Sequence, residues 1–423
     1  MNSIAHINSA CDCLPLARRD IDRKLEAARP AQAFELLKSR ENLFARTPVF
    51  VANEDVKAML AIIAAVEVLA QIDGYRQEVF SRAGIERKTA DRNHTNGLFM
   101  GYDFHLSEDG PKLIEVNTNA GGAFLVSNLL RAVGPDISCC YNSQVYNAVV
   151  SPDGMDEFMV EMFKREWAIA GNLSPLKTVA IVDENPTEQY LYPELLMAKA
   201  LLERHNITTI IEGPSEFEYR DDGLYAGQLK IDLVYNRLTD FGLSEAGNSS
   251  IRQAYEVGNI VLSPAPVHHA LYADKRNLIL FGEDNKLSEW GLSPAHRRAL
   301  EGVPETRNLT PENADELWAH RKKYFFKPKD GYGSKAAYRG SKITKKVWAR
   351  ISGGTHVAQE FVPPPVRLVS LKDGPVRLKF DLRIYTYAGE SFAMAARVYQ
   401  GQTTNFRTRG GGFAPVIHMQ GVR

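Results

Sequence analysis

The sequence is poor in the features that mark several classes of protein. Its four cysteines have no CxxC spacing, which excludes a zinc site of that kind and fits a reducing cytoplasm. Lysine plus arginine and aspartate plus glutamate both number 51, so no global charge favours nucleic acid or an anionic membrane. The N-terminus lacks a basic stretch followed by an apolar core, so we expect no signal peptide. These absences predict a cytoplasmic protein that binds neither nucleic acid nor membrane.

Long hydrophobic runs and the common nucleotide motifs are also missing. The most apolar run, Val56 to Ile72, is too short to span a bilayer and contains Glu67, so it is typical of a buried helix. No GxxxxGK[ST] occurs, which excludes a Walker A loop. No GxGxxG follows the strand expected at Thr178–Glu184, which argues against a bound dinucleotide.

What is present is an ordinary globular composition with a mixed α/β pattern. The 423 residues are 44% hydrophobic and 24% charged, enough for two or three cores. Helical spacing covers 14–45, 53–83 and 121–133, and a period of two predicts a β-hairpin from Leu98 to Val116, turning at Asp109-Gly110. Strand, helix, strand and strand at 178–184, 192–205, 207–213 and 228–238 predict a parallel sheet of Rossmann type.

The hairpin carries candidate metal ligands. Glu115 and Asn117 are two apart and so face the same side of their strand, and Asp103 is expected near their level on the partner strand. Two carboxylates and an amide oxygen suit Mg²⁺ bound jointly with substrate phosphates. The alternative is the solvated face of an amphipathic hairpin. The following Gly121 and Gly122 open a helix whose free N–H groups are candidates for binding a substrate carboxylate.

A candidate phosphate site comes about two hundred residues later. Lys327 ends an apolar strand, and Gly331, Gly333 and Ser334 follow in a loop whose backbone can close over an anion. The alternative is a hairpin loop with solvated lysines. The lysines at 335, 342, 345 and 346 equally suit a solvated helix face.

Three further strands complete this pattern. Gln359 to Val362 precede a proline stop and offer backbone groups to adenine. Asp381 and Arg383 then share one face of a strand, and Arg397 lies on the next. Arginines beside a phosphate loop can neutralise charge in phosphoryl transfer. Structural salt bridges are the alternative for each of them.

Together these motifs resemble the ATP-grasp superfamily of ATP-dependent carboxylate–amine ligases. Lys327, its loop, the QEFV strand, Asp381-Leu382-Arg383 and Arg397 follow the family's order, and Lys275 in YADKRNLILF matches its earlier ATP lysine. The metal strands should come last, but Asp103 and Glu115-Val116-Asn117 come first. The sequence therefore resembles the circularly permuted branch that includes glutathionylspermidine-synthase-like proteins, in which the hairpin would fold beside the final strands.

The resemblance implies a role for each matching residue. ATP would be bound by Lys275, Lys327, the glycine loop, Gln359, Glu360, Phe361, Val362 and Asp381, with Arg383 and Arg397 catalytic. Two Mg²⁺ ions, replaceable by Mn²⁺, would be held by Asp103, Glu115 and Asn117. Candidate substrate contacts are Gly121, Gly122, Glu194, Asn236, Arg237 and Asn405. Ordinary structural roles are the alternative for these polar side chains.

The resemblance also implies a division of the chain. Residues 1–95 form a helical N-terminal segment, 96–150 the metal-binding hairpin and helix, and 177–270 a Rossmann-like substrate domain. Residues 271–355 form the ATP-grasp lid, and 356–423 the nucleotide-binding subdomain. The implied activity is amide formation from a small carboxylate and an amine or thiol through an acyl phosphate, with a homodimer expected. A phosphotransferase and a non-catalytic nucleotide-binding protein are the alternatives.

Overall fold

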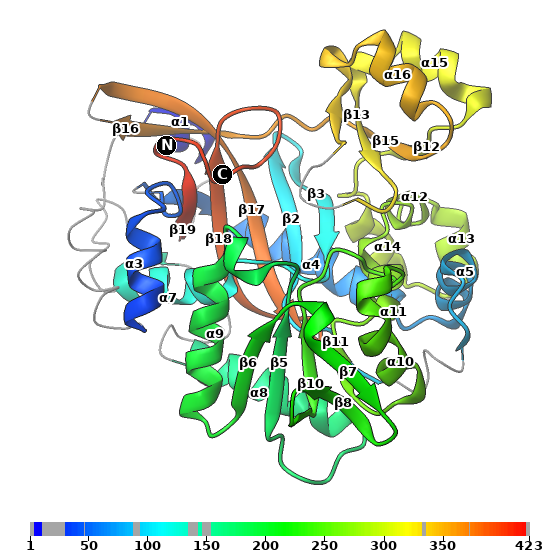
Figure 1. Cartoon of the computed structure of the whole chain (residues 1–423). Coiled ribbons are helices and arrows are strands. Elements are labelled where there is room, and N and C mark those ends of the chain that lie inside the picture. The colour runs from blue at the N-terminus through cyan, green and yellow to red at the C-terminus, as the bar shows by residue number, and fades with distance from the viewer. Residues whose placement is uncertain are drawn as a thin grey trace.

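The computed structural model describes residues 4–10, 30–45, 47–87, 94–133, 143–145, 154–331, 336–371 and 373–419. Within these ranges the protein is a mixed α/β structure in which three sheets matter for the site (Figure 1). The predicted fold class is confirmed at this level. No helix among the described residues is long and apolar enough to cross a membrane.

The central sheet joins segments from both ends of the sequence. Its strands lie in the order β1 (Val49–Ala52), β19 (Gly412–Met419), β18 (Glu390–Tyr399), β17 (Gly374–Tyr387), β2 (Met100–Ser107) and β3 (Gly110–Asn117). Two more strands pair at its margins, β16 (Val366–Leu371) with β17 and β4 (Ser143–Val145) with β19. The early hairpin β2–β3 is thus hydrogen-bonded to late strand β17.

The β2–β3 hairpin contains a β-bulge that decides which side chains meet. Near the turn the register pairs Ser107 with Gly110 and Phe104 with Leu113. The turn residues are therefore 108 and 109, and the turn predicted at Asp109-Gly110 is wrong by one residue. Ile114 is then an extra residue, and Asp103 pairs with Glu115. Without the bulge Glu115 would point to the opposite face, because successive side chains alternate along a strand. The bulge therefore places Glu115 and Asn117 on the face of Asp103.

A second sheet is parallel, as the strand and helix rhythm predicts. Its order is β11 (Val261–Ser263), β10 (Leu233–Asn236), β5 (Thr178–Val182) and β6 (Thr208–Glu212), with every pair parallel. The single strand predicted at 228–238 is two strands. Its first part, β9 (Leu229–Ile231), instead joins β7 (Phe217–Arg220) and β8 (Gly223–Ala226) in a small antiparallel sheet.

The third sheet lies at the upper right of Figure 1, beside α15 (Ala314–Ala319) and α16 (Lys345–Ile351). Its order is β12 (Thr306–Asn308), β15 (His356–Glu360), β13 (Tyr324–Pro328) and β14 (Tyr338–Arg339). Helices α15 and α16 cover it, and Trp348 packs on Phe326 with ring centroids 5.1 Å apart. Strand β15 thus pairs with β12 and β13. This sheet therefore crosses the boundary at residue 355 that was predicted between the lid and the nucleotide-binding subdomain.

The helices pack against these sheets. The helix predicted at 53–83 is two helices, α4 (Asn53–Leu69) and α5 (Asp73–Ala83), and β1 occupies the predicted break at 46–52. Part of the N-terminal segment therefore belongs to the central sheet. The remaining helices are α1 (Ile4–Ala10), α3 (Ala31–Lys38), α7 (Ala123–Val133), α8 (Met155–Ile169), α9 (Tyr192–Arg204), α10 (Ser249–Val257), α11 (Pro266–His268), α12 (Asn277–Leu280), α13 (Asp284–Glu289) and α14 (Pro294–Leu300).

Candidate functional site

A cavity of about 610 Å³ lies where the three sheets meet. Its volume falls in the range of small-molecule sites. The hairpin β2–β3 and strands β17 and β18 form one wall, β13 and β15 another, and the ends of β5 and β10 a third. The cavity therefore brings together residues from the beginning, middle and end of the sequence.

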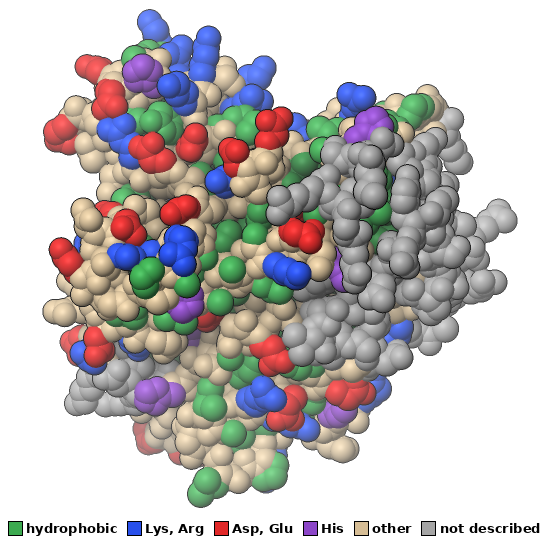
Figure 2. Space-filling model, turned by 180° about the vertical axis from the view of Figure 1, so that it is seen from behind, with side chains coloured by type: hydrophobic (Ala, Val, Ile, Leu, Met, Phe, Trp, Pro, Cys, Tyr) green, Lys and Arg blue, Asp and Glu red, His purple; other side chains and the backbone are tan. Residues whose placement is uncertain are grey.

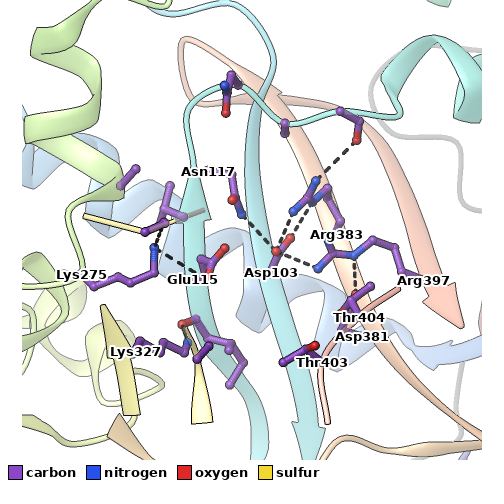
Figure 3. Close-up of a pocket in the computed structure, with 18 of the residues that line it drawn as sticks. Asp103, Glu115, Asn117, Lys275, Lys327, Asp381, Arg383, Arg397, Thr403 and Thr404 are labelled. Atoms are coloured by element: carbon purple, nitrogen blue, oxygen red, sulfur yellow. Dashed lines mark hydrogen bonds and ion pairs between the residues drawn. The ribbon is translucent and has the colours of Figure 1, made fainter. Parts of the chain in front are cut away.

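The three predicted metal ligands all line this cavity. Asp103, Glu115 and Asn117 lie on one face of the hairpin, and the Asn117 Nδ2 donates to Asp103 Oδ2 at 3.0 Å (Figure 3). That orientation turns the amide oxygen of Asn117 away from Asp103. Glu115 lies between the hairpin and Lys275, whose Nζ is 3.9 Å from Glu115 Oε2.

Asp103 is held by two arginines. Arg383 binds it in a bidentate manner, with Nε 2.6 Å from Oδ1 and Nη2 2.7 Å from Oδ2, and the Nη2 of Arg397 donates to Oδ2 at 2.7 Å. Burial alone would raise the pKa of Asp103, but the two guanidinium groups hold it below its usual range, at about 2. Asp103 is therefore a carboxylate at any physiological pH.

Arg397 also connects Asp103 to a second buried carboxylate. Its Nε donates to Asp381 Oδ1 at 2.6 Å, and Asp381 accepts a further hydrogen bond from Thr404 (Figure 3). Arg383 and Arg397 therefore form the structural salt bridges that the sequence left open as an alternative. Both arginines also line the cavity, so the ion pairs and a role toward a ligand are compatible.

The two predicted ATP lysines approach Glu115 from the side of the hairpin opposite the arginines (Figure 3). Lys275 Nζ donates to the Gly331 carbonyl at 2.8 Å, and Lys327 Nζ donates to the Ile114 carbonyl at 2.8 Å. Burial, together with the nearby Lys275, lowers the pKa of Lys327 to about 8, although Glu115 opposes the shift. The carbonyl that accepts from Lys327 belongs to Ile114, the extra residue of the bulge. The bulge therefore orients Glu115 and also supplies the hydrogen-bond acceptor for Lys327 of β13.

The predicted adenine hinge lies at the edge of the cavity. Gln359, Glu360, Phe361 and Val362 all line it. The backbone N–H groups of Glu360 and Phe361 donate to the carbonyls of Glu305 and Lys323, and the Val362 carbonyl accepts from His105 at 2.8 Å. Among the described residues, the Val362 N–H is therefore the hinge donor that is left for a base.

The N-terminus of α7 is already filled. The backbone N–H of Gly122 donates to both carboxylate oxygens of Glu194 at 2.8 Å, and that of Phe124 donates at 3.3 Å. Burial raises the pKa of Glu194, while Arg237 and these N–H groups oppose the rise. The helix end predicted for a substrate carboxylate thus binds a carboxylate of the protein itself, which gives Glu194 a structural explanation.

The other predicted substrate residues divide into two groups. Gly121 and Arg237 line the cavity, whereas Asn236 and Asn405 are not among its lining residues. Asn236 donates to the Pro264 carbonyl and accepts from Leu238 N–H, and Asn405 donates to the Gln400 carbonyl. These local hydrogen bonds are the ordinary structural roles left open by the sequence.

Some predictions fall outside the cavity or outside the described residues. Gly333, Ser334 and Lys335 lie outside the described residues, as do all four cysteines. Lys342, Lys345 and Lys346 are exposed and belong to the region of α16, where Figure 2 shows Lys and Arg side chains on the outer surface. The solvated-face interpretation therefore holds for these three lysines.

Sequence reasoning missed several residues that line the cavity. His105 shares the strand face of Asp103 two residues on, a spacing that could have identified it. Asp183, Phe241 and His269 carry no such signal. Phe241 and His269 stack with ring centroids 3.9 Å apart, and neither ring nitrogen of His269 has a hydrogen-bond partner among the described residues.

The donor set fits a magnesium ion that is bound together with phosphate. Among the described residues no cluster of three or more histidine, cysteine, aspartate or glutamate side chains could hold a metal alone. Glu115, Asn117 and Asp103 supply oxygen atoms from two carboxylates and one amide, and Asp103 is shared with Arg383 and Arg397. Mg²⁺ usually takes one or two carboxylates and completes its shell with water and substrate phosphates.

The sequence matches no protein-family model and no curated protein. The structure is similar to a glutathione synthetase-like effector from Globodera pallida in its apo form, with 13% identity and a TM-score of 0.55. That likeness covers 94% of this chain and 97% of the effector. The likeness shows that this chain shares the fold of that effector, and it shows the fold alone.

Two other solved structures are similar to a lesser degree. A putative gamma-glutamylcysteine synthetase from Methylobacillus flagellatus is 10% identical, with a TM-score of 0.45 and coverage of 84% of this chain and 86% of that one. The ATP-grasp ligase PsnB, in complex with a variant of its minimal precursor, Mg and ADP, is 13% identical. Its TM-score is 0.28, with 54% of this chain and 78% of that chain covered.

Proposed function

We propose that this protein is an ATP-dependent carboxylate–amine ligase of the ATP-grasp type that forms an amide and releases ADP and phosphate. One observation supports the proposal above all. The acidic face of the β2–β3 hairpin lines the same cavity as Lys275 and Lys327, although the hairpin and the lysines are far apart in the sequence. Arg383 and Arg397 line this cavity as well. A circularly permuted ATP-grasp fold accounts for this placement, since β2 and β3 continue the sheet formed by the last strands.

In this proposal the lysines and the hinge bind ATP. Lys275 and Lys327 contact the phosphates, and adenine lies against Gln359–Val362 with the Val362 N–H as donor. Glu115, Asn117 and Asp103 would hold Mg²⁺, which neutralises phosphate charge when bound. Lys275 and Lys327 donate hydrogen bonds to the backbone carbonyls of Gly331 and Ile114, so phosphate oxygens would replace those partners.

The chemistry is phosphoryl transfer to a carboxylate followed by acyl transfer to an amine. A substrate carboxylate oxygen attacks the γ-phosphorus, the bond to the β-phosphate oxygen breaks, and ADP leaves. An amine nitrogen then bonds to the acyl carbon, releases a proton, and expels inorganic phosphate with the C–O bonding pair. Arg383 and Arg397 stabilise the transferring phosphoryl charge, because phosphoryl transfer depends mainly on positioning and electrostatics.

The test uses Glu115→Gln, which removes a carboxylate from the exposed cavity face and leaves the core unchanged. We expect ADP release with mixed carboxylates and amines to fall at least a hundredfold, while the thermal unfolding curve stays unchanged. The matched control is Glu108→Gln, since Glu108 is exposed in the turn of the same hairpin. Unchanged ADP release in Glu115→Gln would contradict the proposal. ADP release that needs a hydroxyl acceptor and no amine would identify a phosphotransferase.

A further inference from the structure

The cavity extends beyond the hairpin to the carboxyl ends of the parallel strands. Asp183 follows β5 and Arg237 follows β10, and both line the cavity. The strands pair Asn236 with Val182, and the Arg237 N–H donates to the Val182 carbonyl at 2.8 Å. From β5 the chain continues to β6 on one side, while β10 lies on the other. Open parallel sheets bind ligands at such a reversal of strand order.

Arg237 differs from most of the cations around the cavity. Lys275, Arg383 and Arg397 each lie within ion-pair distance of a carboxylate. Lys327 and Arg237 have no carboxylate within ion-pair distance among the described residues. The carboxylates of Glu194 and Asp183 lie farther from Arg237 but still near enough to raise its pKa. Lys327 is assigned to ATP phosphate, which leaves Arg237 as a cation for a second anion.

The hydrogen bonds of Arg237 leave donors available. Its Nη1 donates to the Asn119 carbonyl at 2.7 Å and lies 3.5 Å from the Tyr235 hydroxyl. Its Nε is buried and has no partner among the described residues. A guanidinium carries five N–H donors in a planar fork that matches a carboxylate. The Asn119 contact orients that fork while part of it remains unpaired.

Arg237 also lies close to the proposed reaction centre. Arg383 Nη1 donates to the Gly121 carbonyl at 3.4 Å, and a Cβ built on Gly121 would lie 2.9 Å from Arg237 Nη2. The two guanidinium groups therefore flank the same glycine. A small molecule whose reacting group lies beside Arg383 can therefore place a second group, a few bonds away, against Arg237.

The same end of the cavity also offers a negative group. Asp183 follows the strand next to Arg237 and accepts the Glu184 N–H at 2.8 Å. Burial raises the pKa of Asp183 to about 6, although Arg237 opposes the rise, so the group is mainly a carboxylate at neutral pH. A cation and a carboxylate on adjacent strand ends complement the carboxylate and ammonium groups of a free amino acid.

We propose that the amine substrate is a free amino acid whose carboxylate binds Arg237 and whose ammonium group lies beside Asp183. This inference rests on the ligase function proposed above. It narrows the nucleophile from any amine to one that carries its own carboxylate. The arginine acts on a carboxylate that does not react, so it is a positioning residue for the amine.

The experiment compares amino acids with the matching amino acid amides. The probes are glycine, L-alanine, L-cysteine and L-glutamate against their α-carboxamides, each with a mixture of carboxylates and with ADP release as the signal. We expect the acids to be used at least tenfold more efficiently in kcat/KM. Arg237→Gln should raise the KM for the acid at least tenfold, change kcat less than threefold, and leave the amide unaffected. Arg165→Gln, an exposed arginine outside the cavity, is the control.

Arg237→Lys and the thermal unfolding temperature of each variant show whether a loss comes from unfolding. Lysine keeps the charge, so it should restore part of the preference for acids over amides. The inference is overturned if acids and amides are used with equal kcat/KM, or if a folded Arg237→Gln variant has an unchanged KM for the acid. ADP release in those same assays would still support the ligase function.

Saturation-transfer NMR with the same probes separates the two proposals when ADP release fails. Binding of the acids that is lost in Arg237→Gln, without any ADP release, would overturn the ligase function and keep the carboxylate site. Absence of both signals would overturn both.

Discussion

Asp103 and Arg383 occupy paired positions on β2 and β17, and their side chains form a bidentate ion pair with distances of 2.6 and 2.7 Å. The pair connects the early hairpin to the late strands. Arg397 adds a third charge-assisted hydrogen bond to the same carboxylate at 2.7 Å. This cluster is therefore both a structural link between two distant parts of the chain and one wall of the proposed nucleotide site.

The first prediction concerns the stability that this link supplies. Asp103→Asn leaves two buried guanidinium groups without their shared carboxylate, so the free energy of unfolding should fall by about 3–5 kcal/mol. Urea unfolding at neutral pH measures the change. Asp109→Asn in the exposed turn is the control and should have little effect. A change below about 1 kcal/mol for Asp103→Asn would contradict the structural role of the cluster.

The second prediction concerns the pH dependence of ATP use. The folded pKa of Lys327, about 8, lies below its ordinary value of 10.5, so Lys327 loses its charge as pH rises through about 8. The kcat/KM for ATP should therefore fall above that pH, since this ratio reports the free enzyme. Lys327→Arg should remove the alkaline limb, because arginine stays charged. The limb should persist in Lys323→Arg, an exposed lysine outside the cavity, and its persistence in Lys327→Arg would contradict the assignment.

The sign of the stability effect of Lys327 follows from the same shift. Between pH 8 and 10.5 the unfolded chain binds more protons at this lysine than the folded protein does. The buried charge therefore lowers stability below pH 8, and this penalty disappears as pH rises. Urea unfolding should show a smaller rise in stability from pH 8 to 10 in a Lys327→Met variant than in the unchanged protein.

The third prediction concerns the carboxylate at the start of α7. Glu194→Ala removes the acceptor of the Gly122 and Phe124 N–H groups, which should lower the free energy of unfolding by about 1–3 kcal/mol. Glu188→Ala on an exposed turn is the matched control. Addition of acetate should recover part of the loss in the variant. Equal stability of the two variants would show that α7 does not depend on Glu194.

The fourth prediction separates two adjacent glycines. A Cβ on Gly121 would lie 2.6 Å from Leu191 Cδ1 and 2.9 Å from Arg237 Nη2, and both are ends of flexible side chains. Gly121→Ala should therefore fold and raise the KM for the amine about tenfold, without a change in the KM for ATP.

Gly122 has a φ of +106°, and its Cβ would lie 2.2 Å from Phe413 Cζ, so Gly122→Ala should lower stability by about 2 kcal/mol or more. Thermal unfolding and steady-state kinetics distinguish the two glycine variants. Equivalent behaviour of Gly121→Ala and Gly122→Ala would contradict this account.

Much of the fold was predictable because it follows local patterns. Alternation and turn residues indicate β2 and β3, and the helix predicted at 192–205 agrees with α9 (Tyr192–Arg204) to within one residue. Those local patterns do not reveal the bulge at Ile114, because one extra residue leaves no clear mark on the alternation. The expected meeting of Asp103 and Glu115 depends on that bulge.

The contacts across the site were harder to predict because they join distant segments. Glu194 fills the end of a helix that begins some seventy residues earlier, and neither segment alone indicates the partner. Asp183 and Arg237 become neighbours only through the order of the parallel strands. The cation, acid and amide types of the candidate site could be inferred from sequence, but their pairings required the three-dimensional arrangement.

The most direct measurement is a crystal structure with a non-hydrolysable ATP analogue and Mg²⁺. Our account predicts the triphosphate between Lys275 and Lys327 on one side and Glu115 and Asn117 on the other, with adenine against the Val362 N–H. A nucleotide bound elsewhere, with the early hairpin making no contact to its phosphates or metal, would contradict the account.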